Sequence, residues 1–545
     1  MSNSIRSPWF WLTVLALALL GLFVIYPIAN IVSASFLGDG TSGWARMLAT
    51  PRYIQAIKNT LILASAVTVI ATLIGVPLAY VTARYSFPGK SLIALLPLIT
   101  LVIPEVIAAQ TWLMMLGNNG LITRFFREYG IRLPSFYGWF GLITAMSFIY
   151  YTYVYIGVVA AIGKFDSQLE EAAQSLGTSP VRSRMQVMVP VIMPAILASA
   201  LLVFTMTVGN FAISMILSQR LPLLSVVTYQ AAVAEGAADI TMQSTLASTS
   251  VVIVMLVLFL NRWIVSRGKY EIVQGRGARP APLRGFGSLL VAIPAGLVVL
   301  VSLLPLITIV LGAFTASRGP VIQWGNWTLA NLERVFISAP QPLINSLTYA
   351  GIATVISIAF SAVVSYVIIK KPNILTPLVD YAAAVPLALS GTVLGVGLLA
   401  TFHGGWLPLS GTASIIVLAY VVRRMPFGMR NSQSTLHNIP DSIEEASISL
   451  GVPPVATFFK VVLPVMLPAV ASAAIITWTT TVAELSASIL VYSGGRETLP
   501  IQVFRLIDSN LMAYASAYGL VLITVILLPI IIATKVFRID VFSSR

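Results

Sequence analysis

The sequence contains no cysteine, two histidines and few charged residues. Only 9% of its 545 residues are Asp, Glu, Lys or Arg, whereas about 25% is usual in a soluble domain. Without cysteine, the chain has no disulfide, no thiolate zinc site and no cysteine-ligated iron–sulfur cluster. His403 and His437 are isolated in predicted loops, so no histidine-rich metal site is expected either.

The sequence also lacks a phosphate-binding loop of the form G-x-x-x-x-G-K-[ST]. We therefore expect that the chain does not hydrolyse ATP, and no convincing nucleophile arrangement indicates an enzyme. The net charge is +14, but the basic residues are spread along the chain. Because they form no single patch, no nucleic-acid partner is predicted.

Apolar residues are abundant, at 58% of the chain. Charge-poor runs repeatedly exceed the about 20 residues that a helix needs to cross a bilayer. Unpaired backbone groups cannot sit in lipid, and the runs are too long for barrel strands. We therefore expect an all-α integral membrane protein with twelve transmembrane helices. The predicted spans are 9–37, 59–83, 91–117, 133–163, 185–219, 240–261, 285–317, 335–369, two within 381–422 (divided at 403–411), 461–492 and 509–534.

The lysines and arginines predict the orientation. With the N-terminus in the cytoplasm, 21 of the 32 basic residues fall on the cytoplasmic side, in line with the positive-inside bias. The first apolar run is too long for a signal-peptide core and is interpreted as a retained span. Arg423 and Arg424 are expected to end the tenth span at the cytoplasmic edge. Twelve spans then place both termini in the cytoplasm.

The chain divides into two similar halves around a basic segment rich in Gly and Pro, 262–286. NTL at 59–61 resembles NSL at 345–347, and EEAAQSLG at 170–177 resembles EEASISLG at 444–451, 274 positions later. We expect a six-span domain over 1–261, a cytoplasmic linker over 262–286 and a second six-span domain over 287–545. Because each half has an even number of spans, the two should share one orientation around a pseudo-two-fold axis.

The repeated EEA stretches predict a helix, a sharp turn and a second short helix. Ser167 and Glu170 have the spacing of a capping box, and Asp441 and Glu444 repeat it. Gly177 stands where a left-handed residue ends a helix, as Gly451 does in the second copy. Ser179 is a candidate cap, and the proline after it suits a first helical turn. The expected product is a rigid pair of short helices in each loop, 164–190 and 437–464.

With its spacing of Gly177, Val187, Val189 and Pro190, the first EEA stretch resembles the EAA loop of ABC importer permeases, and the second copy differs mildly at Ser447. The resemblance covers the whole chain and implies two tandem, MetI-like six-helix domains of the type I importer class. The stretches 421–430 and 484–495 look most like permeases of ferric-iron importers. The resemblance assigns ATPase coupling to Glu170, Glu171, Ala172, Ala173 and Gly177, and to Glu444, Glu445, Ala446, Ser447 and Gly451.

The family's mechanism is alternating access in a bacterial inner membrane. A homodimeric ABC ATPase would grip both EEA loops from the cytoplasm, using ATP and Mg, while this chain binds no cofactor. A periplasmic binding protein would deliver the substrate, with 117–138, 219–243 and 493–511 as candidate docking surface. The lipid bilayer is the remaining partner.

Three polar residues within the spans are candidates for the substrate pathway or its gate. An ionisable group at bilayer depth costs on the order of 3 kcal/mol, so Glu484 and Glu105 require an explanation. Asn210 stands 274 positions before Glu484, and we expect the two to face one another across the pseudo-axis. For Glu484, the structural alternative is a glutamate satisfied by a serine, threonine or backbone partner within the bundle. The tyrosine-rich run 150–155 is interpreted as packing or interface, although phenolate oxygens would suit a hard cation.

Ferric iron is the expected substrate, and no residue is assigned to hold the metal. Phosphonate, polyamine, thiamine and sugar phosphate are alternatives within the same class. A secondary transporter driven by an ion gradient would explain the repeat and the intramembrane glutamates. It would not explain two matched loops on one side of the membrane.

Overall fold

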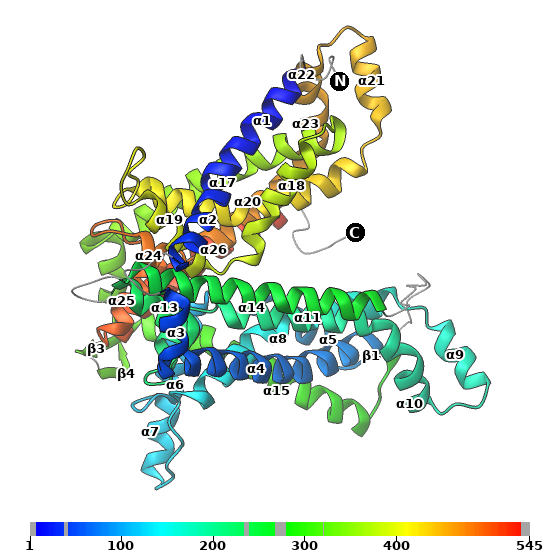
Figure 1. The fold of residues 1–545 in the computed structure, drawn as a ribbon. Helices are drawn as coiled ribbons and strands as arrows, with labels where there is room; N and C mark the ends of the chain where they lie inside the picture. Colours follow the sequence, from blue (N-terminus) through cyan, green and yellow to red (C-terminus); the bar gives the residue numbers. More distant parts are fainter. Residues whose placement is uncertain (1–6, 37–41, 234–238, 268–279, 320, 536–545) are drawn as a thin grey trace. The chain divides into compact units, whose positions relative to one another are not determined.

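The computed structural model describes residues 7–36, 42–233, 239–267, 280–319 and 321–535, and helices dominate them (Figure 1). Two small sheets accompany the helices. Tyr85–Ser86 (β1) pairs in parallel with Ala281–Pro282 (β2), and Thr315–Arg318 (β3) pairs antiparallel with Val321–Trp327 (β4). The prediction of an all-α membrane protein is confirmed.

Nine helices in the described part of the chain are long and apolar enough to cross a membrane, or up to eleven if each of two bent pairs is one span. The expected number of twelve is therefore not reached. The nine are Pro8–Phe36, Pro51–Arg84, Trp139–Lys164, Pro180–Gly209, Ile240–Leu260, Phe286–Ala313, Gln341–Lys370, Pro454–Val482 and Met512–Ala533.

The missing span is the tenth. Residues 413–437 form one helix, α20 (Ala413–His437), which continues well past the apolar segment. Because this helix carries Arg423, Arg424 and Arg430, it is too highly charged to be counted among the apolar helices that could cross a membrane. Arg423 and Arg424 therefore lie inside a helix and do not end it. Their place at the cytoplasmic edge of the membrane stays a prediction.

A proline lies at or near the break in each of the two bent pairs, Pro104 in the first and Pro386 in the second. In the first, α5 (Lys90–Thr100) and the segment Glu105–Glu128, which begins with α6 (Glu105–Leu116), are bent by 110°, with Pro104 at the start of α6. In the second, Thr376–Leu387 and α19 (Gly391–Phe402) meet at 112°. Proline lacks the N–H that would continue the helix, and Ser390 caps the new helix by accepting the N–H of Val393 at 3.3 Å.

The chain forms two compact units that exchange their first spans. Unit 1 comprises Met1–Ala49, Thr228–Val251 and Gly312–Arg545; unit 2 comprises Thr50–Val227 and Val252–Leu311. In unit 1, α1 (Pro8–Leu20) packs on α17 (Gln341–Lys370). In unit 2, Ser302 of α15 (Phe286–Ala313) is 3.0 Å from the hydroxyl of Tyr151. The sequence halves 1–261 and 287–545 thus describe the repeat, whereas each compact unit combines pieces of both.

The linker predicted at 262–286 begins inside a helix, because α14 runs from Ile240 to Arg267. Residues 268–279 lie outside the described part of the chain. The described end of the segment includes β2.

Candidate functional site

Each EEA loop folds as a short helix, a left-handed glycine and a second short helix, as predicted. The first contains α9 (Gln168–Ser175) and α10 (Pro180–Ser183); the second contains α21 (Asp441–Ser449) and α22 (Pro454–Thr457). The φ angles of Gly177 and Gly451 are +88° and +86°. L-residues with a Cβ rarely adopt this region, so the turn depends on glycine.

The helix starts differ from the prediction. Ser179 does cap α10, by accepting the N–H of Arg182 at 3.4 Å. Among the described residues, however, neither Ser167 nor Asp441 caps its helix with a side-chain bond. Asp166 accepts the N–H of Gln168 at 3.0 Å instead. The capping-box interpretation is therefore wrong. The glutamate that would complete each box, Glu170 or Glu444, binds a cation instead.

Glu170 and Glu444 point inward. Each is at least 96% buried, with 3% and 4% of its surface exposed. Glu170 forms an ion pair with Arg84, the last residue of α4 (Pro51–Arg84). Glu444 accepts from Lys371 at 2.7 Å, immediately after α17. The first glutamate of each pair therefore joins its loop to the end of a long helix.

Much of the rest of each loop is exposed and presents apolar side chains beside a glutamate. Leu176 is 89% exposed and Leu450 is 85% exposed, each directly before the glycine. Glu171, Ala172, Glu445 and Ala446 are also exposed, as are Val181, Met185, Val455 and Phe459. Ser447 departs from this pattern, because it is buried and its hydroxyl is 3.0 Å from that of Thr457.

In unit 2, the structure brings two of the three predicted pathway residues together. The hydroxyl of Tyr150, on α8 (Trp139–Lys164), donates to Oε1 of Glu105 at 2.6 Å. The amide of Asn210 donates to the same hydroxyl at 2.8 Å. Tyr150 is fully buried, so the packing interpretation of this residue holds, but its polar role was missed.

Asn210 also organises a break in the membrane helix. It follows α11 (Val189–Gly209) and precedes α12 (Ala212–Leu217). Its side-chain oxygen accepts the N–H groups of Ile213 and Ser214 at 3.0 and 3.2 Å. These are donors that the start of a helix leaves without an intrahelical partner.

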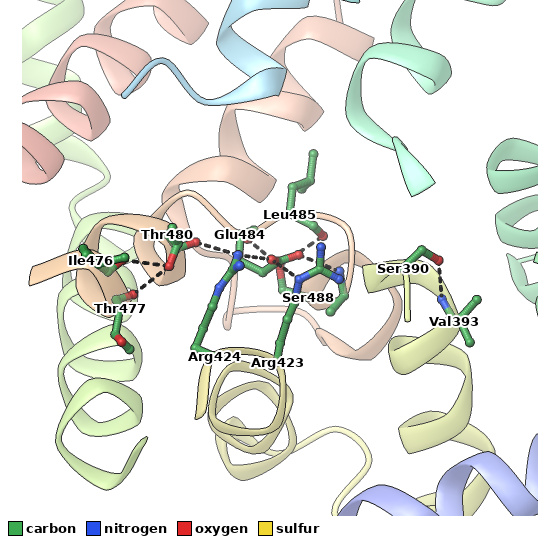
Figure 2. Close-up of polar contacts among 11 residues, drawn as sticks. Ser390, Val393, Arg423, Arg424, Ile476, Thr477, Thr480, Glu484, Leu485 and Ser488 are labelled. Carbon is green, nitrogen blue, oxygen red and sulfur yellow. Dashed lines mark hydrogen bonds and ion pairs between the residues drawn. The ribbon is translucent and has the colours of Figure 1, made fainter. Parts of the chain in front are cut away.

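In unit 1, Glu484 occupies the corresponding break between α23 (Leu463–Val482) and α24 (Ser488–Val491). Its Oε1 accepts the N–H of Ala487 at 3.1 Å. Figure 2 shows Arg423 and Arg424 extending from α20 toward its carboxylate, at 2.8 and 2.5 Å from Oε2. The structural alternative for Glu484 is thus met in part, by the backbone N–H of Ala487, and the two arginines are further partners that the sequence did not predict.

Comparison with known proteins identifies the family. The profile described as "Binding-protein-dependent transport system inner membrane component" matches residues 75–269. A probable molybdenum ABC transporter permease of Haloferax volcanii is 30% identical over 210 residues, covering 38% of this chain and 74% of that protein. The chain belongs to this family of ABC transporter permeases.

Two relatives that are longer than the Haloferax protein match the permease over nearly its whole length. The ferric transport system permease protein FbpB of Actinobacillus pleuropneumoniae is 24% identical, over 93% of this chain and 75% of its own. The Fe(3+)-transport system permease protein FbpB 2 of Haemophilus influenzae is 26% identical, over 97% of this chain and 99% of its own. The permease is a multi-pass inner-membrane component of an ABC importer, and membership implies an ATPase and a binding protein as partners.

The permease places its polar candidates in separate units. Asn210 and Glu105 lie in unit 2, and Glu484 lies in unit 1. The expectation that Asn210 and Glu484 face one another therefore stays a prediction. In the described residues, no three His, Cys, Asp or Glu side chains are placed to hold a metal ion.

Proposed function

We propose that this permease imports ferric iron by alternating access, driven by a homodimeric ATPase that grips both EEA loops. The main support for this mechanism is that both loops expose an apolar side chain at the same position. Leu176 and Leu450 project beside left-handed glycines at the same position of each repeat. An apolar side chain on a rigid turn suits insertion into a cleft of a partner. Both termini and both loops would then lie on the cytoplasmic side.

Iron is proposed as the cargo because relatives that match nearly the whole chain are named ferric transport permeases. The oxygen chemistry of unit 2 is compatible with a hard cation, since a carboxylate and a phenol meet at Glu105 and Tyr150. We propose that Glu105, Asn210 and Glu484 border the pathway at the two helix breaks. The binding protein would dock on the opposite side, on 117–138, 219–243 and 493–511.

The test is uptake into proteoliposomes that contain the permease, its ATPase and its loaded binding protein. Labelled ferric iron should accumulate only with ATP and Mg, and collapse of the proton gradient should leave uptake unchanged. Phosphonate, polyamine, thiamine and sugar phosphate serve as competing cargoes. Molybdate is added to them, because one relative is named as a molybdenum permease. Uptake of one of these compounds instead of iron would show that the proposed substrate is wrong and would leave the ATP-driven mechanism standing. Uptake that needs an ion gradient would overturn the mechanism.

A further inference from the structure

We propose that Glu170 and Glu444 are positioning residues that fasten the two EEA loops to α4 and α17, and that they do not touch the ATPase. This inference rests on the proposed function and deepens it. The two glutamates of each EEA stretch would have different roles. The second, Glu171 or Glu445, faces the partner, and the first passes the movement on to a long membrane helix.

The first loop shows the contact in its simplest form. The ion pair of Glu170 with Arg84 leaves 5% and 12% of the two side chains exposed. The backbone carbonyl of Glu170 also accepts the hydroxyl of Ser183 at 3.2 Å, which ties α9 to the end of α10. Glu170 therefore connects both short helices of the loop to the last residue of α4. With so little water around it, an ion pair is screened less than one on the surface.

The second loop has the same contact with additional partners. Glu444 accepts from Lys371 at 2.7 Å and from the hydroxyl of Tyr366 at 3.1 Å. One residue earlier, Lys370 donates to Asp441 at 2.5 Å and to the carbonyl of Ile439 at 2.6 Å. Two adjacent lysines thus hold two acidic residues of one short helix.

The repeat places these groups at similar but not identical positions. Glu170 and Glu444 are 274 positions apart. By the offset of 286 between NTL and NSL, the counterpart of Arg84 is Lys370, which pairs with Asp441, and Glu444 pairs with the next residue, Lys371. A cation therefore stands at the end of the second helix of each half, and a buried glutamate stands in each loop. Unlike Glu170, its neighbour Glu171 is exposed.

A partner that moves α9 can move α4 directly through this contact. If the contact is removed, α9 can shift without α4, and ATP hydrolysis proceeds with less transport. Because loop 2 keeps the separate ion pair of Lys370 with Asp441, loss of its glutamate should matter less there. The inference thus predicts an order of effects, with Glu170→Gln stronger than Glu444→Gln.

The experiment measures ATPase co-purification and the substrate transported per ATP hydrolysed, in the assembled transporter. Glu170→Gln should keep association and lower transport per ATP by about two- to thirty-fold. The charge swap Arg84→Glu with Glu170→Arg should restore coupling. Glu171→Gln is the contrasting variant, and it should weaken association. If Glu170→Gln loses the ATPase, or keeps wild-type coupling, the inference is wrong.

A second measurement needs no partner. Because the chain has no cysteine, Gln174→Cys gives a single site for a nitroxide on the exposed side of α9. Glu170→Gln should raise the mobility of this label, the charge swap should lower it again, and Glu171→Gln should leave it unchanged. Unchanged mobility in Glu170→Gln would overturn the inference. Failure of the wild-type chain to bind any ATPase would instead count against the proposed function, and the label would still report on the contact.

Discussion

Arg424 donates from Nη2 to Oε2 of Glu484 at 2.5 Å, and the same nitrogen bonds to the carbonyl of Thr480 at 2.8 Å. This contact joins α20 to the last turn of α23, where the membrane helix breaks. Tyr150 stands 274 positions before Arg424, and it bonds to Asn210 at the break after α11. The two halves therefore make the same connection with different chemistry, an ion pair in one and neutral hydrogen bonds in the other.

Loss of one partner of the ion pair in unit 1 should destabilise the permease strongly. Removing one partner of a buried pair leaves an uncompensated charge and costs about 3–5 kcal/mol. We expect Glu484→Gln to lower the free energy of unfolding by that order, measured by thermal or denaturant unfolding of the purified permease. The matched control is Asp380→Asn, which breaks a pair with Arg430 in which the two side chains are 30% and 53% exposed, and should cost about 0–1 kcal/mol. Equal losses in the two variants would contradict the role of burial.

The hydrogen bonds of Tyr150 should contribute less. Tyr150→Phe removes the bond to Glu105 and the bond from Asn210 while it keeps the ring, so we expect a loss of about 1–3 kcal/mol. Tyr151→Phe is the control, because that buried hydroxyl has its close side-chain contact with Ser302 at 3.0 Å. Unfolding of both variants should show the larger loss for Tyr150. A larger loss for Tyr151 would mean that the network at the break contributes little.

The sequence predicts the repeated features well, because they depend on local chemistry. The glycine turns, the proline after Ser179 and the long apolar helices all follow from residues close together in the chain. The exchange of first spans between units was missed, because the apolar surface of α1 or α15 does not specify its partner. The ion pairs of Arg423 and Arg424 were missed for a similar reason. Their role depends on Glu484, which is about 60 positions away, and no local pattern links them.

The glycine turn gives a prediction that separates backbone strain from steric clash. A Cβ at Gly177 would meet no described atom within 4 Å, yet φ is +88°. The left-handed region costs an ordinary L-residue about 1–2 kcal/mol, and asparagine tolerates it better. We expect Gly177→Val to lose ATPase association and transport with membrane insertion intact, and Gly177→Asn to keep more of both.

Gly163 supplies the control for this comparison. It lies in the last turn of α8, and a Cβ there also meets no described atom within 4 Å. Because its φ is helical, Gly163→Val should change association much less than Gly177→Val. Co-purification with the ATPase measures both variants. Equal losses would show that added bulk, and not the left-handed backbone, disrupts the loop.

Asp441 gives a pH dependence in the second loop. The hydrogen bond from Lys370, followed by the charge of Lys370, holds the pKa of Asp441 below its ordinary value of 3.8. A lowered pKa means that the stabilisation is present above pH 3.8 and is lost as the pH falls through the folded-state pKa. Near neutral pH, the unfolding temperature of the wild type should therefore be higher than that of Asp441→Asn. The difference should vanish in acid. In a Lys370→Met background, Asp441→Asn should make little difference at any pH.

Leu176 and Leu450 should bind the ATPase without stabilising the permease. Because both are almost fully exposed, Leu176→Ser should leave the unfolding temperature unchanged while it weakens ATPase binding by about tenfold, the effect of a moderate interface contact. Tyr129→Ser is the control, since this residue is 70% exposed on the side predicted to face away from the ATPase. If each loop engages its own subunit, the losses of Leu176→Ser and Leu450→Ser should add in the double variant. Titration of detergent-solubilised permease with the purified ATPase measures these affinities, and an unchanged affinity in the double variant would remove the exposed leucines from the proposed interface.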